Sequence, residues 1–250
     1  MTKHILPVAF ALALLLLAGV ASAQDAVPIP RVNIGVEQAQ NPEEVATSLQ
    51  ILGLLTILSL APALLIMTTA FTRIVIVFSF LRTALGTPTI PPNQVVIGLS
   101  LFLTFFVMSP TLSKLNEEAL QPYMKKEVSL DVAKERAWST MRDFMFRQTY
   151  KRDLALFAGL SGAQYETLED VRWQELVPAF ILSEIKTAFV IGFYIFVPFL
   201  VIDLVVASTL MSMGMMMLPP AIVSLPAKIL VFLLADGWSV IVQALAGGFR

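Results

Sequence analysis

Long apolar runs, separated by short polar breaks, cover most of the chain. Four of them could form membrane-crossing helices: residues 49–71, 95–109, 178–210 and 221–246. A helix needs about 20 apolar residues to cross a bilayer, so the second run, which ends at Pro110, is short for that role. The pattern predicts an all-α integral membrane protein of helical hairpins, with about four long apolar helices. The first apolar helical hairpin is expected over residues 47–110 and the second over residues 178–250.

A proline-rich loop is expected between the first two runs. Residues 85–94 contain three prolines and Gly86, a composition typical of a turn. Arg73 and Arg82 precede this loop and flank residues 74–81, which are too few to cross a membrane alone. If the N-terminus lies outside the membrane, the loop lies in the cytoplasm, and its arginines agree with the positive-inside bias.

The middle of the chain is strongly polar. Residues 114–175 carry 10 basic and 11 acidic side chains. Between residues 129 and 160, apolar positions recur every three or four residues, which predicts an amphipathic helix. We therefore expect residues 111–177 to form a small polar helical extramembrane region on the periplasmic side. Acidic and basic residues are interleaved, so the charges predict a solvated face and no nucleic-acid patch.

The N-terminus has the features of a secretory signal peptide. Lys3 and His4 precede an apolar stretch, and small residues follow it at Ala21 and Ala23. Cleavage would then fall between Ala23 and Gln24, giving a signal peptide of residues 1–23; an uncleaved anchor helix is the alternative. Residues 24–46 are rich in proline, glutamine and asparagine without apolar periodicity, which predicts a flexible N-terminal linker.

Composition supports a membrane protein and argues against an enzyme. Apolar residues make up 57% of the chain and charged residues 14%, with a mean hydropathy of +0.79 and a net charge of −1. The chain has no cysteine, and its single histidine is His4, in the predicted signal peptide. Phosphate-binding loops and nucleophile elbows are also missing from the sequence. We therefore predict no catalytic residues, no metal and no cofactor.

Three ionisable residues interrupt the third apolar run: Glu184, Lys186 and Asp203. Such groups are costly at membrane depth, so they usually face a partner or a wet cavity. Glu184 and Lys186 are two positions apart and point to different sides of a helix, so their partners must lie on other helices or in other copies. A hairpin turn near Met217 would bring Asp203 level with the residues just past Lys228. The candidate partners are Lys228, Arg73 and Arg82.

A different interpretation is available for the first two of these charges. Glu184 and Lys186 could lie at the aqueous end of the span and cap it. Asp203 is deeper in the apolar run, so a buried role is harder to dismiss for this carboxylate.

Methionines concentrate at the predicted turn of the second hairpin. Five of the chain's 11 methionines lie within seven positions, before Pro219 and Pro220: Met211, Met213, Met215, Met216 and Met217. Methionine is unbranched and polarizable, so it adapts to partners of different shape. Filling of core gaps is the usual role of clustered methionines. A turn has little core to fill, however, so several copies of this tip could together form a soft seal.

Six runs of residues resemble the signatures of the FliP family. Three lie around the proline-rich loop: Phe71–Ile74, Leu81–Pro88 and Pro91–Gln94. The other three are Leu101–Phe106, Ser183–Phe189 and Gly214–Pro220. The similarity extends from about Leu49 to Trp238. Runs of this length in this order are far more specific than a short motif.

The resemblance implies a core pore-forming subunit of the flagellar type III protein export gate in the bacterial cytoplasmic (inner) membrane, at the flagellar basal body. FliP-like proteins form ring-like homo-oligomers, for which a pentamer is expected. They assemble with FliQ-like and FliR-like subunits and other export apparatus proteins, and they pass unfolded flagellar proteins outward. The methionine tips form a gasket in such assemblies, a role that carries over to Met211, Met213, Met215, Met216 and Met217. The family's hairpins also lie largely outside the bilayer plane once assembled.

Two other functions are compatible with the sequence. An export-gate homologue of a virulence injectisome belongs to the same class, but the predicted signal peptide and linker favour the flagellar protein. A proton-coupled transporter could use the intramembrane carboxylates as a relay. Transporters often contain two related halves, and the chain shows no such repeat.

Overall fold

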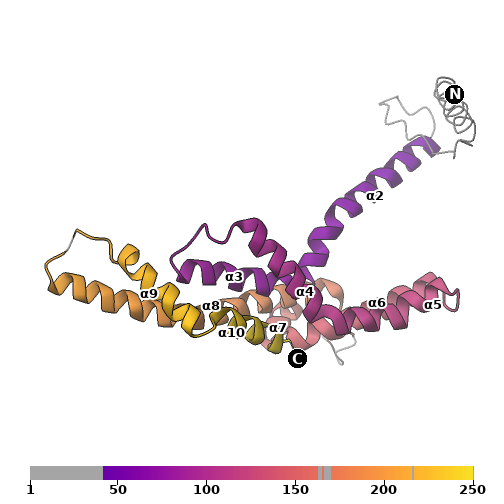
Figure 1. Cartoon of the computed structure of the whole chain (residues 1–250). Coiled ribbons are helices and arrows are strands. Elements are labelled where there is room, and N and C mark those ends of the chain that lie inside the picture. Colours follow the sequence, from indigo (N-terminus) through magenta and orange to yellow (C-terminus); the bar gives the residue numbers. More distant parts are fainter. Residues whose placement is uncertain (1–41, 163–164, 166–169, 216, 250) are drawn as a thin grey trace, which may run out of the picture. The chain divides into compact units, whose positions relative to one another are not determined.

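In the computed structural model, residues 42–162, 165, 170–215 and 217–249 are described. The predicted signal peptide, its cleavage residues Ala21, Ala23 and Gln24, most of the predicted linker and Met216 lie outside them. Regular structure in the described part is entirely helical, which confirms the all-α prediction (Figure 1). The helices are α2 Pro42–Met67, α3 Phe71–Ala84, α4 Asn93–Leu115, α5 Gln121–Met124, α6 Leu130–Gln148, α7 Lys151–Ser161, α8 Trp173–Ser212, α9 Pro220–Leu234 and α10 Gly237–Gly247.

The chain divides into two compact units, Met1–Gly53 and Leu54–Arg250. Helix α2 begins in the first unit and includes residues 42–46, which were predicted to belong to the linker. It ends at Met67, where the hydroxyls of Thr68 and Thr69 donate to carbonyl groups of the last turn. The predicted first hairpin therefore contains three helices, α2, α3 and α4, because α3 forms separately after this break.

Helix α4 does not end at Pro110, where the sequence predicted an end. Proline removes one backbone hydrogen bond but is tolerated within membrane helices when neighbouring groups compensate. The helix continues to Leu115 and then through a π-helical segment, Asn116–Leu120, into α5. The continuous helical stretch is Asn93–Met124.

Two helices replace the single amphipathic helix that was predicted in the polar region. Ser129 caps α6 by accepting a hydrogen bond from the Val132 amide. Thr149 and Tyr150 have extended backbone angles, which separate α6 from α7. Helix α7 ends at Gly162, whose φ of +68° places it in the left-handed region.

The long helix α8 organises the second unit. Its 40 residues correspond to a length of about 60 Å at ~1.5 Å per residue. Helices α3, α6, α7 and α9 all pack against it. The buried core between α3 and α8 is formed mainly by aliphatic and aromatic side chains, among them Ile74, Val77, Leu81, Leu176, Phe180 and Ala188.

Three helical stretches in the described residues are long and apolar enough to cross a membrane: 48–67, 93–124 and 173–212. The fourth predicted span is broken. Helices α9 and α10 meet at an angle of 62°. Asp236 adopts a left-handed backbone at the break, and the Phe232 ring lies so close to Gly237 that a Cβ there would be 2.1 Å from it. The pair makes a fourth span only if both helices are counted together.

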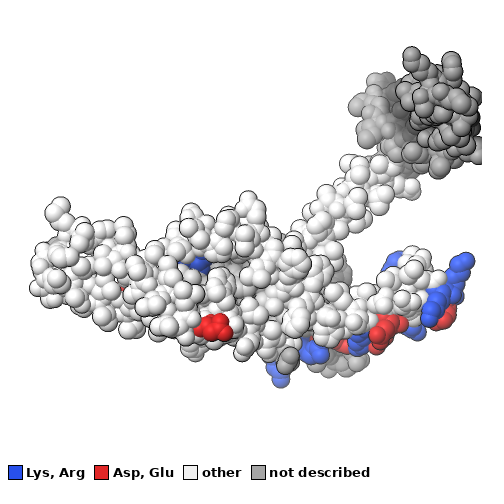
Figure 2. All heavy atoms as spheres, in the orientation of Figure 1, with Lys and Arg blue, Asp and Glu red and all other residues white. Residues whose placement is uncertain are grey.

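Charge is distributed unevenly over the second unit. Figure 2 shows that lysines, arginines and carboxylates gather over α5 and α6, whereas the visible face over α8 and α9 is almost free of them. The polar region is therefore suited to water, and the surface towards the α8–α9 turn is suited to an apolar environment.

Candidate functional site

Two features of the second unit correspond to the predicted site residues. One is a network of ion pairs that joins α8 to its neighbours. The other is the methionine-rich tip between α8 and α9. Both are built on the same long helix, α8.

Arg73 and Glu184 form a fully buried ion pair between α3 and α8. The Arg73 side chain is 3% exposed and that of Glu184 is 0% exposed. The guanidinium binds both carboxylate oxygens, with Nε donating to Oε2 at 2.9 Å and Nη2 donating to Oε1. This bidentate arrangement is the strongest that arginine makes with a carboxylate. The charge of Glu184 is therefore satisfied inside the protein by Arg73 rather than by water.

Arg73 also fixes two other parts of the chain. Its Nη2 donates to Gln148 Oε1 at 3.0 Å, at the end of α6, and its Nη1 donates to the Gly248 carbonyl at 3.1 Å, after α10. The guanidinium carbon lies 3.8 Å from the centroid of the Phe249 ring, a cation–π contact. One side chain therefore connects α3, α6, α8 and the C-terminal end of the described chain.

Lys186 pairs with Asp153 of α7, a residue that sequence reasoning did not include. Asp153 is 2% exposed, whereas the Lys186 side chain is 49% exposed. Ser183 donates to the second Asp153 oxygen at 2.8 Å and accepts from the Tyr150 amide at 3.0 Å. Burial acts to raise the pKa of Asp153, but the hydrogen bonds from Lys186 and Ser183 and the nearby positive charges outweigh it and lower the pKa.

The structure brings Asp203 and Lys228 together across the α8–α9 hairpin. Lys228 Nζ lies 2.7 Å from Asp203 Oδ2 and also donates to the Ala84 carbonyl at 3.3 Å. Ser224, one turn before Lys228, donates to the other Asp203 oxygen. This pair is half-buried, with side-chain exposures of 6% for Lys228 and 33% for Asp203.

Arg82 has a different role from the other predicted partners. Its Nη1 donates to the Pro91 carbonyl at 3.2 Å and to Asn93 Oδ1 at 2.6 Å. No carboxylate pairs with it among the described residues. Arg82 therefore ties the proline-rich loop to α3.

The tip between α8 and α9 has a defined backbone. The Gly214 amide donates to the Met211 carbonyl at 3.0 Å, and the Met215 amide donates to the Leu210 carbonyl at 2.9 Å. These two bonds, with Gly214 at φ +77°, make a Schellman motif that ends α8. Pro219 and Pro220 then start α9, where a missing amide hydrogen costs nothing.

Methionine side chains at this tip project from the single chain. Their exposures are 58% for Met211, 65% for Met213, 37% for Met215 and 99% for Met217. Leu210, by contrast, is 7% exposed. The described methionines of the tip do not fill a core, so the interpretation as core packing is wrong for this chain by itself. Large exposed apolar groups of this kind usually mark a surface that meets another molecule.

Five of the six signature-like runs contain residues of the ion pairs, of the Arg82 contacts or of the methionine tip, and Leu101–Phe106 is the exception. The chain matches the FliP family over residues 54–245. The chain belongs to the FliP family. It is 54% identical over 217 residues to flagellar biosynthetic protein FliP of Bacillus subtilis (strain 168), covering 86% of this chain and 98% of that protein. The same-named protein of Pectobacterium carotovorum subsp. carotovorum is 55% identical over 203 residues, 81% of this chain and 79% of that protein.

A relative from Caulobacter vibrioides extends the similarity along the chain. That flagellar biosynthetic protein FliP is 46% identical over 247 residues, which is 98% of this chain and 90% of the relative. FliP family membership and three helices suited to crossing a bilayer together indicate a multi-pass protein of the inner membrane.

In this FliP-family chain, the run Ser183–Phe189 connects several elements. Glu184 binds α3, while Ser183 and Lys186 bind Asp153 of α7. Thr187 lies 3.0 Å from the hydroxyl of Tyr150, which precedes α7. The run therefore positions α3 and α7 on α8, which gives a physical reason for so many polar residues within an apolar helix.

Sequence reasoning missed three polar partners in the network of ion pairs. Asp153, Gln148 and Ser224 carry no signal by spacing, because each joins its partner only when helices pack. Clusters of three or more histidine, cysteine or acidic residues that could hold a metal ion do not occur in the described part of the chain. The chemistry that these residues offer is charge pairing and apolar contact.

Proposed function

We propose that this chain is a core pore-forming subunit of the flagellar type III protein export gate. In this role it passes unfolded flagellar proteins across the cytoplasmic membrane, and its methionine tip is a gasket. The observation that carries the proposal is the projection of Met211, Met213, Met215 and Met217 from a rigid helix end. The similarity to proteins named flagellar biosynthetic protein FliP supports the flagellar setting over an injectisome.

Such a gasket requires several copies. We infer a ring-like homo-oligomer, with a pentamer as the expected form, together with FliQ-like and FliR-like subunits and other export apparatus proteins. In the ring, the tips of neighbouring copies would bury the methionines against one another. Flexible apolar side chains can close a pore by packing and dewetting, and they can yield to substrates of many shapes. The driving force for transport would come from partner proteins.

We propose a supporting role for the charged residues. Arg73, Glu184, Lys186, Asp203 and Lys228 would hold each subunit in the conformation that assembles, while Arg82 would hold the proline-rich loop. The carboxylates of Glu184 and Asp203 are each engaged with a cation. This engagement favours a structural role over the proton relay of a coupled transporter, because a relay needs carboxylates that can exchange protons.

The proposal also includes the roles that the sequence predicts for the signal peptide, the linker and the polar region. Residues 1–23 would be removed after export of the N-terminus, and residues 24–46 would link the mature N-terminus to the first span. The region 111–177 would then lie on the periplasmic side. The charged side chains that gather over α5 and α6 in Figure 2 support a position in water, outside the bilayer.

Ion leakage through the assembled complex tests the gasket. We expect simultaneous replacement of Met215, Met216 and Met217 by alanine to raise the conductance of reconstituted membranes several-fold while the complex still assembles. Met124, which is 69% exposed in α5, provides a matched control, since Met124→Ala should leave conductance unchanged. Unchanged conductance of the triple variant in an intact complex would refute the gasket.

A further inference from the structure

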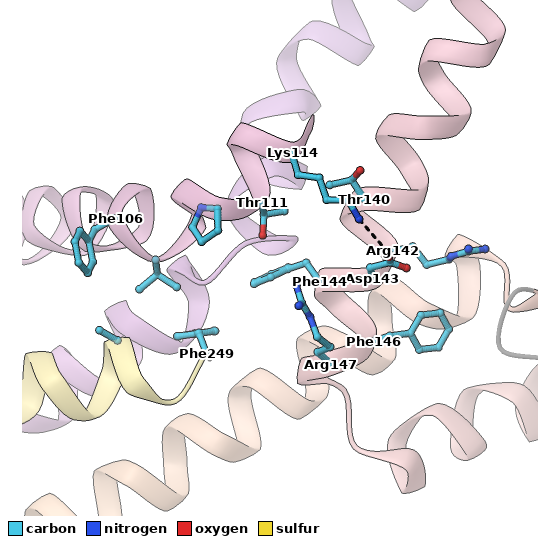
Figure 3. A pocket seen from close by; sticks show the side chains of 13 residues that line it. Phe106, Thr111, Lys114, Thr140, Arg142, Asp143, Phe144, Phe146, Arg147 and Phe249 are labelled. Carbon is cyan, nitrogen blue, oxygen red and sulfur yellow. Dashed lines mark ion pairs between the residues drawn. The ribbon is translucent and has the colours of Figure 1, made fainter. Parts of the chain in front are cut away.

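A large cavity lies between α4, α6 and the end of α10, and its wall at Phe249 contacts Arg73 of the ion-pair network. Its volume is about 850 Å³. Figure 3 shows side chains from α4, α6 and the end of the described chain around one space, with Lys114 and Thr111 above Phe144 and Arg147 below it. The aromatic part is formed by Phe106, Phe144 and Phe249, and the polar part by Thr111, Lys114, Asp143 and Arg147.

The cavity wall is fixed by the rest of the fold. Phe249 stacks on Phe144 with ring centroids 6.4 Å apart. The other interaction of Phe249 is with Arg73, whose guanidinium is held by the buried pair with Glu184. These contacts hold the Phe249 side of the cavity against α6 and Arg73.

Three polar side chains that line the cavity are suited to binding an anion: Arg147, Thr111 and Lys114. In Figure 3 the Arg147 side chain extends from α6 into the cavity beside Phe144, whereas the Arg142 guanidinium points away. Arg147 has no carboxylate partner among the described residues. Thr111 is 7% exposed and lines the cavity. A threonine hydroxyl in the wall of a cavity can donate a hydrogen bond to a ligand.

Lys114 supplies a second cation that is only weakly engaged. Its Nζ lies 3.8 Å from Asp143 and 4.0 Å from Glu118, and all three side chains are about half exposed. Ion pairs of this kind contribute little to stability, so Lys114 can turn towards another anion at small cost. Without Arg142, whose guanidinium points away, the lining carries two cations, Lys114 and Arg147, and one carboxylate, which still gives a net positive charge.

The helix below these cations is strongly apolar and exposed. Phe102, Phe106, Pro110 and Lys114 are spaced by four residues, so they follow one face of α4. Phe102 is 77% exposed and Phe106 is 66% exposed. From Phe106 to Lys114 the helix rises about 12 Å at ~1.5 Å per residue. One face of a candidate membrane span thus changes from exposed aromatic rings to a cationic cavity.

We propose that this cavity binds an anionic phospholipid, with its phosphate at Arg147, Lys114 and Thr111 and an acyl chain along Phe106 and Phe102. Arginine binds phosphate through two parallel hydrogen bonds, and lysine adds a point charge. Basic pockets between membrane helices bind acidic headgroups in the same way. A soluble acidic segment of a protein would satisfy the cations but leave the phenylalanines of α4 uncovered, which favours the lipid.

Lipid retention by the purified complex tests this site. Native mass spectrometry would count adducts after addition of phosphatidylglycerol or phosphatidylethanolamine. We expect preferential retention of phosphatidylglycerol by the unmodified protein and about a tenfold loss in the double variant Lys114→Gln/Arg147→Gln. The charge-matched control Lys134→Gln/Lys151→Gln removes two exposed cations outside the cavity and should retain the lipid. Equal loss in both double variants, or loss in neither, would overturn the proposal.

Further variants and a competing ion distinguish a bound phospholipid from other possible occupants of the cavity. Arg147→Lys keeps the charge and should lose only about threefold in retention, which also guards against misfolding of the double variant. Phe106→Ser should weaken long-chain phosphatidylglycerol more than a short-chain form. Displacement of the lipid by inorganic phosphate would identify a free-ion site instead. Efficient cross-linking of two copies through Phe106→Cys, in a chain without natural cysteine, would show that another subunit fills the cavity and would equally overturn the proposal.

Discussion

The first half of helix α8 is packed by this chain's own helices, whereas its second half is largely uncovered. Between Trp173 and Ala188 the helix buries Leu176, Phe180 and Glu184 against α3, α6 and α7. Beyond Ala188 the buried residues are Gly192, Phe199 and Leu210, and most other side chains are exposed. The comparison shows that one half of the helix is packed within the subunit and that the other half is left to be covered by lipid or by other subunits.

The two halves also differ in the kind of residue that they contain. Buried charges in the first half have specific partners at fixed geometry, so a substitution there acts on the folded subunit. In the second half, Asp203 pairs with Lys228 and Phe189 contacts Phe80, but the methionines at its end project from the chain. Substitutions there should act on the assembled complex. Four changes, in order of decreasing effect on the subunit, test this distinction.

Removing one member of the Arg73–Glu184 pair should have the largest effect. Arg73→Ala leaves the Glu184 carboxylate buried without its cation, which costs about 3–5 kcal/mol. The expected result is a strongly lowered Tm of the detergent-solubilised protein and reduced abundance in membranes. The exposed pair Lys134–Asp131 serves as control, because Lys134→Ala should cost about 0.2–1 kcal/mol.

A double replacement sharpens this prediction. Arg73→Met combined with Glu184→Leu removes both charges and leaves no unpaired carboxylate, so it should destabilise less than Arg73→Ala. A double variant that is less stable than the single one would indicate that the arginine's bonds to Gln148 and Gly248 contribute more than its pairing with Glu184.

Asp153→Asn should have an intermediate effect that depends on pH. The folded-state pKa of Asp153 lies below its ordinary value of about 3.9. The ionised carboxylate therefore stabilises the fold above that ordinary pKa, and this contribution is lost as pH falls through the lowered folded-state pKa. Because Lys186 is half exposed, we expect a cost of about 1–2 kcal/mol at pH 7.

Thermal melting at pH 7 and at low pH checks this prediction. The Tm difference between the unmodified protein and Asp153→Asn should shrink at low pH. A difference that stays constant between these conditions would show that the carboxylate's charge is not what joins α7 to α8. Glu135→Gln, on exposed surface of α6, controls for general loss of a carboxylate.

Gly214→Ala should have an effect no larger than that of Asp153→Asn, confined to the helix end. Gly214 adopts φ +77°, and a Cβ would meet no atom within 4 Å, so only the left-handed backbone opposes the substitution. The expected cost is about 1–2 kcal/mol. Gly98 of α4 also has open space around it but lacks a positive φ, so Gly98→Ala should be neutral or slightly stabilising. Equal Tm values for both alanine variants would contradict the strained turn.

The sequence predicted these regions unequally, for physical reasons. Apolar run length predicts helices well, because each apolar helix must satisfy its backbone internally. It could not predict the break between Met67 and Phe71 or the bend at Asp236, since threonine hydroxyls and the Phe232 ring act there through local contacts. The continuation of α4 through Pro110 also depends on context.

The partners of the candidate site residues were also predicted unequally from the sequence. Asp203 and Lys228 lie on adjacent arms of one hairpin, so sequence position alone suggested their proximity. Glu184 needed a partner, and Arg73 was among the candidates, but spacing could not select it over Arg82. Asp153 could not be identified, because it belongs to a polar helix whose packing on α8 depends on the turn at Thr149 and Tyr150.

Truncation of the methionine tip should have the smallest effect on the subunit and a large one on the complex. Met211, Met213 and Met217 are at least half exposed, so replacing them together by alanine removes few contacts within the chain. Each such surface change is usually worth within about 0.5 kcal/mol. The Tm of the isolated subunit should therefore remain near that of the unmodified protein.

The assembled complex provides the contrasting measurement for the same variant. If neighbouring tips bury these side chains, alanine removes apolar contact in every copy at once, so ion leakage should increase although subunit stability does not. Leucine at the same three positions keeps apolar volume with less flexibility, and it should restore more of the seal than alanine. A Tm loss as large as that of Arg73→Ala, without added leakage, would place these methionines in the subunit's own packing and would remove the distinction between the two halves of α8.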